Sequence, residues 1–317
     1  MALVSSATAG LTLALRSLHA TPGTLCMIPA WTFAASAHAA RAAGLIPWFV
    51  DVDERTWELT PAAARRLLRE APTKVGAILA VAPFGRPIDI AGWETLNANE
   101  DCAVVVDAAA AFDSTRASTV VTVVSLHATK ILGVGEGAFV TCSDVAVVDS
   151  VSQRANFGFR GDREALVDAT NAKLSEYAAA LGLAGLGRWD ETRASFLRVG
   201  AEYASALSGI AGVALQPGFG REWIATTANI SIPPERIEPL EDALDAEGFG
   251  YRRWWGDGLI AHRAFDDCPR TATPVTERLR GSVLGLPCWR DLPAKEIRDV
   301  AAVVRAVCAG VDPAGGE

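Results

Sequence analysis

Lys130 is the residue best placed in the sequence for nucleophilic chemistry. It follows the apolar run 120–124 within a short polar turn, and a glycine-rich stretch and a second apolar run, 138–141, come after it. A lysine that attacks a carbonyl group must lose its proton at some stage, and burial promotes this loss. The spacing is also compatible with a solvated loop lysine, so both interpretations stay open at this point.

Asp107 is a second residue of chemical interest, because it ends the apolar run AVVVD and is followed by alanines. A carboxylate in such a place is costly to bury unless it has a cationic partner. A protonated pyridine nitrogen is such a partner, and pairing with it makes pyridoxal phosphate (PLP) an electron sink. Asp is also a favoured helix-capping residue, so an N-cap directly after the strand is the alternative.

The small residues SSATAG (5–10) open a predicted helix near the N-terminus. Free backbone N–H groups and the helix dipole at such a helix start suit a phosphate group. We expect Thr8 and Ala9 to donate from the main chain, and Thr8 also from its hydroxyl. The alternative is an ordinary Ser/Thr-capped helix with no ligand.

The elements that must position these residues alternate between helix and strand up to about residue 145. Apolar residues at helical or strand-like spacing predict helices at 6–20, 32–44 and 60–70, and strands at 24–29, 46–50, 75–82, 103–106, 120–124 and 138–141. Repeated strand–helix–strand units predict an α/β fold with a mainly parallel sheet covered by helices on both faces. Functional groups should then gather at the carboxyl ends of the strands.

The second half of the chain predicts a different organisation. Residues 160–210 are interpreted as long helices, 228–233 as a strand, and 237–246 and 294–309 as further helices. We therefore expect a large domain over residues 1–200 and a smaller C-terminal α+β domain over 201–317. The domains should pack closely, and the tail DPAGGE should be frayed.

Composition and charge exclude several classes of protein. A formal net charge of −8 argues against a general nucleic-acid surface. The apolar runs are too short to span a membrane, and the N-terminus, which lacks a basic region, is interpreted as a buried helix and not a signal peptide. Six cysteines without a C-x-x-C pair and four scattered histidines favour a cytoplasmic protein with reduced thiols and no metal site.

Taken together and in this order, the three motifs resemble the DegT/StrS-type sugar aminotransferases, which are fold-type I PLP enzymes. The S-x-H-x-x-K segment with its following E-G pair is the most specific match. The resemblance covers essentially the whole chain and rests on SSATAGLTLAL (5–15), PAWTFAASAHAARAAGLIPWFVDVD (29–53), PFGRPIDI (83–90), VVVDAAAAFDS (104–114), SLHATKILGVGEGAFV (125–140), NAKLSEYAAALGLAGLGRWDE (171–191) and LPCWRDLPAKEIRDVAAVVRAV (286–307).

The resemblance implies a role for each residue that carries the reaction. Lys130 would bond covalently to PLP and then move a proton between the substrate carbon and the cofactor carbon. Asp107 would pair with the pyridine nitrogen. Phe33 matches the aromatic position that stacks on the cofactor ring, with Trp31 as a nearby rival.

The resemblance also implies phosphate and substrate contacts. Thr8, Ala9 and Ser125 would hold the phosphate, and Asn171, with Lys173 beside it, matches a segment that reaches the phosphate of a neighbouring subunit. The implied assembly is therefore a homodimer with shared active sites.

Three further residues match positions on the substrate side of the family's site. His127 lies three residues before the lysine, Arg252 matches a family arginine, and His262 lies in a segment similar to the family's substrate-side histidine segment. For these three, packing or surface roles are an open alternative.

The chain departs from the family pattern at three places. Ala110 stands where the family usually has a Gln that contacts the ring oxygen of PLP, which predicts weaker cofactor binding. Ala138 replaces a usual Gly. The sequence begins four residues before the phosphate motif, whereas family members usually carry roughly fifty residues there, which leads us to expect a shortened member or a differently built substrate pocket.

The function that the resemblance implies is transfer of an amino group from glutamate to a nucleotide-linked keto-sugar. The compact spacing from Lys130 to Glu136 favours reaction at C4 of the sugar over C3. A non-catalytic homologue that serves as a regulatory or partner subunit is the alternative. A nucleotide-binding α/β protein of another kind is disfavoured, because the sequence has no G-x-G-x-x-G or P-loop motif.

Overall fold

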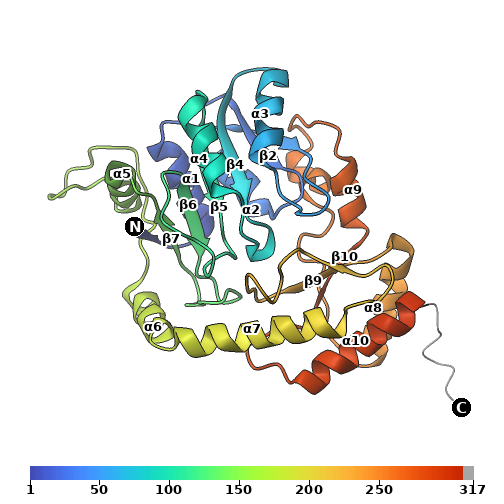
Figure 1. The fold of residues 1–317 in the computed structure, drawn as a ribbon. Coiled ribbons are helices and arrows are strands. Elements are labelled where there is room, and N and C mark those ends of the chain that lie inside the picture. The colour runs from blue at the N-terminus through green and yellow to red at the C-terminus, as the bar shows by residue number, and fades with distance from the viewer. Residues whose placement is uncertain (310–317) are drawn as a thin grey trace, which may run out of the picture.

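The computed structural model describes residues 1–309 and builds them around two β-sheets (Figure 1). The larger sheet has seven strands in the order β1-β7-β6-β5-β4-β2-β3. These strands are β1 (Ala2–Val4), β2 (Leu25–Pro29), β3 (Ile46–Val50), β4 (Val75–Val81), β5 (Ala103–Asp107), β6 (Val121–Ser125) and β7 (Ala138–Thr141). The predicted frayed tail lies outside the described residues.

The larger sheet is mainly parallel, as predicted. Strands β3, β2, β4, β5 and β6 pair in parallel, and only β7 runs antiparallel to its neighbours β6 and β1. Side chains in a strand alternate between the two faces. Leu79 and Val105 accordingly belong to the core on one face, and Ile78 and Val104 to the core on the other. Burial on both faces explains why these strands are continuous apolar runs.

Helices cover both faces of this sheet. On one face lie α1 (Ala7–Ser17), α2 (Ala34–Ala42) and α5 (Val145–Ala155), whose apolar residues share one core cluster. On the other face lie α3 (Pro61–Glu70) and α4 (Ile90–Asn99). The expected α/β architecture is therefore confirmed.

The C-terminal part has its own antiparallel sheet and its own core. The sheet contains β8 (Ala214–Leu215), β9 (Ala228–Ser231) and β10 (Val283–Leu286), in the order β10-β9-β8. Figure 1 shows α7 (Trp189–Ala206) lying beside α10 (Ala294–Ala309), and both helices join α8 (Ile237–Ala246) and the small sheet in one apolar cluster. Two further helices are α6 (Glu176–Leu186) and α9 (Pro274–Arg280). The proposed division at residue 200 stays a prediction.

Several predicted boundaries are wrong, for physical reasons that involve distant partners. The first helix begins at Ala7, because residues 2–4 form a strand that pairs with β7. The segment 160–175 is not helical; Asn171 pairs with Asn156, and Lys173 pairs with Val4 at the edge of the sheet. Helices α4 and α5 were not predicted. Among residues 1–309, no helix combines the length and the apolar composition that a membrane crossing requires.

Candidate active site

Lys130 and Asp107 lie at the same end of the large sheet, where its parallel strands have their carboxyl ends. Asp107 is the last residue of β5 and pairs with Val123 of the neighbouring parallel strand β6, after which the chain enters the lysine turn. Backbone hydrogen bonds fix this turn, since Lys130 N–H donates to the His127 carbonyl at 2.8 Å and Ala128 N–H donates to the Gly135 carbonyl at 2.8 Å. The carboxyl ends of parallel strands thus bring the two residues together, as predicted.

The chain contains four lysines, and their surroundings differ. Lys74 pairs with Asp101 at 2.9 Å, Lys295 pairs with Asp299, and Lys173 Nζ donates to Asn171 Oδ1 at 2.6 Å. Lys130 is half-buried and makes no ion pair with any of residues 1–309. Its amine is therefore the one that is withdrawn from water without a carboxylate bound to it, which does not fit an ordinary solvated loop lysine.

Asp107 is buried, with 6% of its surface exposed. Its Oδ2 accepts a 2.7 Å hydrogen bond from the Ser36 hydroxyl, and its Oδ1 accepts a 3.2 Å hydrogen bond from the Ala109 backbone N–H. No helix starts directly after β5, since the chain there forms turns at 109–110 and 112–114. The helix N-cap alternative for Asp107 is therefore wrong.

The electrostatics of this pair follow from burial. Burial lowers the pKa of the Lys130 amine, and the negative charge of Asp107 opposes that shift. Burial raises the pKa of the Asp107 carboxyl, while the Ser36 hydroxyl, the Ala109 N–H and the Lys130 charge act in the opposite direction. An amine whose pKa is lowered by burial, with a buried carboxylate nearby, is a typical arrangement of a functional site.

Phe33 and Trp31, the two aromatic candidates, differ in exposure. Phe33 precedes α2 as its N-cap, and 60% of its surface is exposed. Trp31 is only 2% exposed and packs edge-on against Trp255, with ring centroids 5.6 Å apart. Of the two rings, only that of Phe33 is free to contact a ligand.

Helix α1 and strand β6 approach each other closely. A side chain at Gly10 would meet Val123 Cγ1 at 2.9 Å, so glycine is what lets the helix lie against the strand. Thr8 and Ala9 are in the first turn of α1, but Ala9 N–H already donates to Ser6 Oγ at 3.2 Å. Ser125 is buried at the end of β6, and its Oγ accepts from His127 N–H at 3.1 Å.

Asn171 and Lys173 lie beside this helix start, on the segment that borders β1. Ser5 N–H donates to the Ala172 carbonyl at 2.7 Å, and both Asn171 and Lys173 are exposed. The Lys173 amine also lies 4.4 Å from the centroid of the Phe157 ring. The two side chains therefore sit on an outer edge of the large sheet.

His127 is held by the lysine turn itself. Its Nδ1 lies 2.9 Å from Thr129 Oγ1 and accepts from Thr129 N–H at 3.2 Å. Nε2 lies 3.6 Å from Glu136 Oε1 of the E-G pair. The imidazole is therefore oriented by two residues, Thr129 and Glu136, and is partly exposed.

His262 and Arg252 line two different cavities. His262 and Phe33 line a cavity of about 230 Å³ together with Trp254, Trp255 and Asp257. Arg252 lines a cavity of about 570 Å³ between the 249–254 segment, the end of β10 and α10. The structure thus brings His262 to Phe33, whereas Arg252 lies on the other side of Trp254, which borders both cavities.

Three residues of this region were missed by sequence reasoning. Ser36 contacts Asp107, Thr226 contacts the lysine turn, and Trp254 borders both cavities. Ser36 lies three residues after Phe33, so the predicted helix could have placed the two within one turn. Nothing in the sequence indicates the contact of Thr226, which joins segments 97 residues apart.

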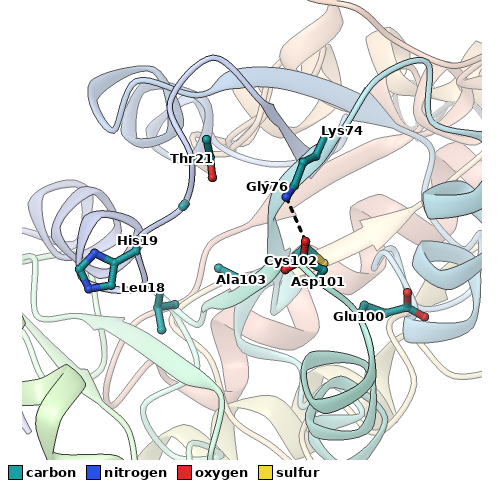
Figure 2. Close-up of a pocket in the computed structure, with 10 residues that line it drawn as sticks. Leu18, His19, Thr21, Lys74, Gly76, Glu100, Asp101, Cys102 and Ala103 are labelled. Carbon is teal, nitrogen blue, oxygen red and sulfur yellow. Dashed lines mark hydrogen bonds and ion pairs between the residues drawn. The ribbon is translucent and has the colours of Figure 1, made fainter.

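A further cavity, of about 280 Å³, lies at the opposite end of the large sheet, where strands β4 and β5 begin (Figure 2). It is lined by residues just before β4 and β5, among them Lys74, Asp101 and Cys102, and by the loop after α1. It is therefore remote from the carboxyl ends where Asp107 and Lys130 lie. Within residues 1–309, no group of three or more His, Cys, Asp or Glu side chains is arranged to hold a metal ion.

Comparison with known proteins gives relatives over nearly the whole chain. Protein Rv3402c of Mycobacterium tuberculosis is 33% identical over 292 residues, which cover 88% of this chain and 70% of that protein. The dTDP-3-amino-3,4,6-trideoxy-alpha-D-glucose transaminase of Streptomyces venezuelae is 28% identical, with coverage of 98% and 83%. The dTDP-4-amino-4,6-dideoxy-D-glucose transaminase of Shigella dysenteriae is also 28% identical, with coverage of 87% and 78%.

Solved structures share the fold. DesV of S. venezuelae superposes with a TM-score of 0.88 at 27% identity, and the match covers 98% of this chain and 85% of that one. The model of the DegT/DnrJ/EryC1/StrS aminotransferase family matches residues 1–305. With this match, the fold and the Lys130–Asp107 site, the chain belongs to the DegT/DnrJ/EryC1/StrS family of PLP-dependent aminotransferases.

Proposed function

We propose that this protein transfers an amino group from glutamate to a keto-sugar that is carried by a nucleotide. The observation that carries this proposal is the buried Asp107 carboxylate, which forms no ion pair with any of residues 1–309 and feels only the charge of Lys130. A buried carboxylate at a strand end favours a cation, and the protonated ring nitrogen of PLP supplies one. Lys130 lies at the same end of the sheet, and burial lowers the pKa of its amine.

The residues present fit PLP. Asp107 would hold the pyridine nitrogen, and the exposed ring of Phe33 would cover one face of the cofactor. The first turn of α1 and Ser125 would hold the phosphate, as helix N-termini do. Because Ser6 already occupies the Ala9 N–H, the Thr8 backbone and hydroxyl carry more of this contact than the sequence predicts.

Lys130 is the base that the chain supplies to the reaction. When bound, PLP withdraws electrons from the substrate carbon attached to the amino group. The Nζ atom of Lys130 would be the base that takes a proton from the substrate carbon and returns it on the cofactor side of the amino group. Burial lowers the pKa of the Lys130 amine, which favours the neutral form that can accept a proton.

The substrate class rests on two of the named relatives, those of Streptomyces venezuelae and Shigella dysenteriae, which are transaminases of dTDP-linked amino sugars. His262 borders the cavity next to Phe33, and the imidazole of His127 is held beside Lys130, so these two side chains would contact the sugar. Arg252 would contact a more distant part of the substrate from its own cavity. The spacing from Lys130 to Glu136 favours amination at C4 over C3.

We further propose a cytoplasmic homodimer with shared sites. Helix α6 exposes the apolar side chains Tyr177, Leu181, Leu183 and Leu186, and contiguous exposed apolar surface is typical of an interface. Asn171 and Lys173, on the segment that leads to α6, would reach the phosphate of the partner. None of the six cysteines forms a disulfide, which fits a reducing compartment. Light scattering should give twice the chain mass, and L183E should give the single-chain mass.

The second candidate is a non-catalytic partner subunit, and Ala110 is the residue that favours it. The joint presence of Asp107 and of an amine with a lowered pKa opposes it, because a subunit without chemistry needs neither. We therefore place catalysis first.

The test has two stages. The protein is first saturated with PLP and mixed with glutamate, and 2-oxoglutarate should form in an amount equal to the sites present. Keto-sugars linked to dTDP, UDP and GDP, each with the keto group at C3 or C4, are then added, and mass spectrometry should detect an amino sugar from one of them. K130A should form neither product, whereas K74A, which alters an exposed lysine, should form both. A colourless wild-type protein that ignores added PLP would contradict the proposal and support the partner-subunit function.

A further inference from the structure

Ser36 makes the shortest side-chain contact of Asp107. It lies in the first turn of α2 and is completely buried. Its hydroxyl donates to Asp107 Oδ2 at 2.7 Å, and the Thr32 hydroxyl lies 3.5 Å from the Ser36 oxygen. Thr32 can thus donate to Ser36 while Ser36 donates to the carboxylate. This places two consecutive buried hydroxyl groups behind Asp107.

We infer that Ser36 is a positioning residue, which keeps the Asp107 carboxylate ionised and aimed at the ring nitrogen of the cofactor. The inference rests on the proposed PLP site. A hydrogen bond from a hydroxyl favours the charged form of a carboxyl group over the neutral form. Because Ser36 takes one site on Oδ2 and Ala109 N–H takes one on Oδ1, the carboxylate cannot rotate without losing a hydrogen bond, and lone pairs remain on both oxygens for a cation.

The same helical turn also holds the aromatic residue of the site. Phe33 is the N-cap of α2, and Ser36 is three residues later, so a single turn presents an exposed ring and a buried hydroxyl. Movement of this turn would displace both the proposed ring contact and the carboxylate that holds the ring nitrogen. Ser36 therefore couples the two contacts of the cofactor ring.

The variants S36A and S36T separate this role from simple packing. Loss of a hydrogen bond to a charged group should weaken PLP binding about 10-fold or more in S36A, whereas S36T keeps the hydroxyl and should stay within a few-fold of wild type. The absorption of lysine-bound PLP changes with pH, and the pH at which this change occurs should be higher in S36A than in wild type. The reason is that a less firmly protonated ring nitrogen withdraws less charge from the linked Lys130 nitrogen.

Ser17 provides the matched control. It is also a buried serine, on the far end of α1, and its hydroxyl has no hydrogen-bond partner among residues 1–309. S17A makes the same chemical change and should leave both PLP affinity and the pH of the absorption change as in wild type. Urea unfolding of the cofactor-free proteins measures what each substitution does to the fold itself.

A double-mutant cycle with D107N decides the outcome. If Ser36 acts through Asp107, S36A should weaken PLP binding in the wild-type background but have little further effect in the D107N background. Equal effects in both backgrounds, or an S36A protein whose PLP affinity and pH response match those of S17A, would overturn the inference. Because lysine-bound PLP is the readout, a wild-type protein that binds no PLP would instead contradict the proposed function.

Discussion

Thr226 donates a hydrogen bond from its side-chain Oγ1 to the backbone carbonyl of Thr129, at 2.8 Å. Thr226 precedes β9 of the C-terminal sheet, and Thr129 directly precedes Lys130. The contact therefore ties the C-terminal part of the chain to the turn that carries the proposed catalytic amine.

The variant T226V tests whether this contact orients Lys130. We expect kcat/KM to fall about 2- to 12-fold, since a neutral hydrogen bond contributes about 0.5–1.5 kcal/mol. Steady-state kinetics with glutamate measures the change. T227V is the matched control, because the Thr227 hydroxyl contacts Asn229 and not the lysine turn, and its kinetics should stay near wild type. Equal kinetics for T226V and wild type would show that the contact is structural only.

The variant D107N tests the cation-binding role of the buried carboxylate. Removing one partner of a buried ion pair costs about 3–5 kcal/mol, so PLP affinity should fall at least about 100-fold. Absorbance titration with PLP gives this affinity. D101N changes an exposed carboxylate at the opposite end of the sheet and should bind PLP with the affinity of wild type. D107N binding PLP as tightly as D101N would refute the role of Asp107.

The lowered pKa of Lys130 predicts how the cofactor-free protein responds to pH. A lysine whose pKa is lower in the folded protein than in the unfolded chain lowers the free energy of unfolding. It does so as long as the lysine is protonated in the unfolded chain, whether or not it is also protonated in the folded protein. This cost disappears as the pH rises from the lowered value through 10.5, the ordinary lysine pKa. K130M should therefore have a higher free energy of unfolding than wild type, and this difference should be smaller at pH 10 than at pH 7.

Urea unfolding of the cofactor-free wild type and K130M at a series of pH values measures this difference. K295M alters an exposed lysine paired with Asp299 and serves as the control. Its difference in stability from wild type should not become smaller between pH 7 and pH 10. A stability difference between K130M and wild type that stays constant from pH 7 to pH 10 would contradict the lowered pKa.

The variant A110Q tests the departure from the family pattern at the proposed ring-oxygen contact. A glutamine should add one hydrogen bond of about 1 kcal/mol, so PLP should bind about fivefold more tightly. A110L has a side chain of similar size without a donor and should show no such gain. If A110Q binds no better than A110L, another group already serves the ring oxygen.

The fold was largely predictable because its strands are buried on both faces. Strand β3 matches the predicted 46–50, and β4 ends one residue before the predicted 75–82, since short continuous apolar runs are typical of parallel strands buried on both faces. Strand β1 was missed because its three residues become a strand only by pairing with β7, about 135 positions later. The same long-range pairing explains the extended chain at Lys173.

The site was predictable only where chemistry and local pattern coincide. Asp107 ends an apolar strand, where a charge is costly to bury, and Lys130 lies in the short polar turn that follows another apolar strand. Ser36, by contrast, acts through a contact with a residue 71 positions away, and its sequence environment of alanines gives no sign of it. The separation of Arg252 from His262 by Trp254 likewise depends on side-chain packing.

The most direct test of the central claim is to reduce the PLP-treated protein with borohydride, which makes a lysine–PLP bond permanent, and to locate the modified residue by peptide mass spectrometry. The chain offers only four lysines, so the result is unambiguous. We predict a pyridoxyl group on Lys130 at close to one per chain, with Lys74, Lys173 and Lys295 unmodified. A modification spread over the exposed lysines, or none at position 130, would contradict the account.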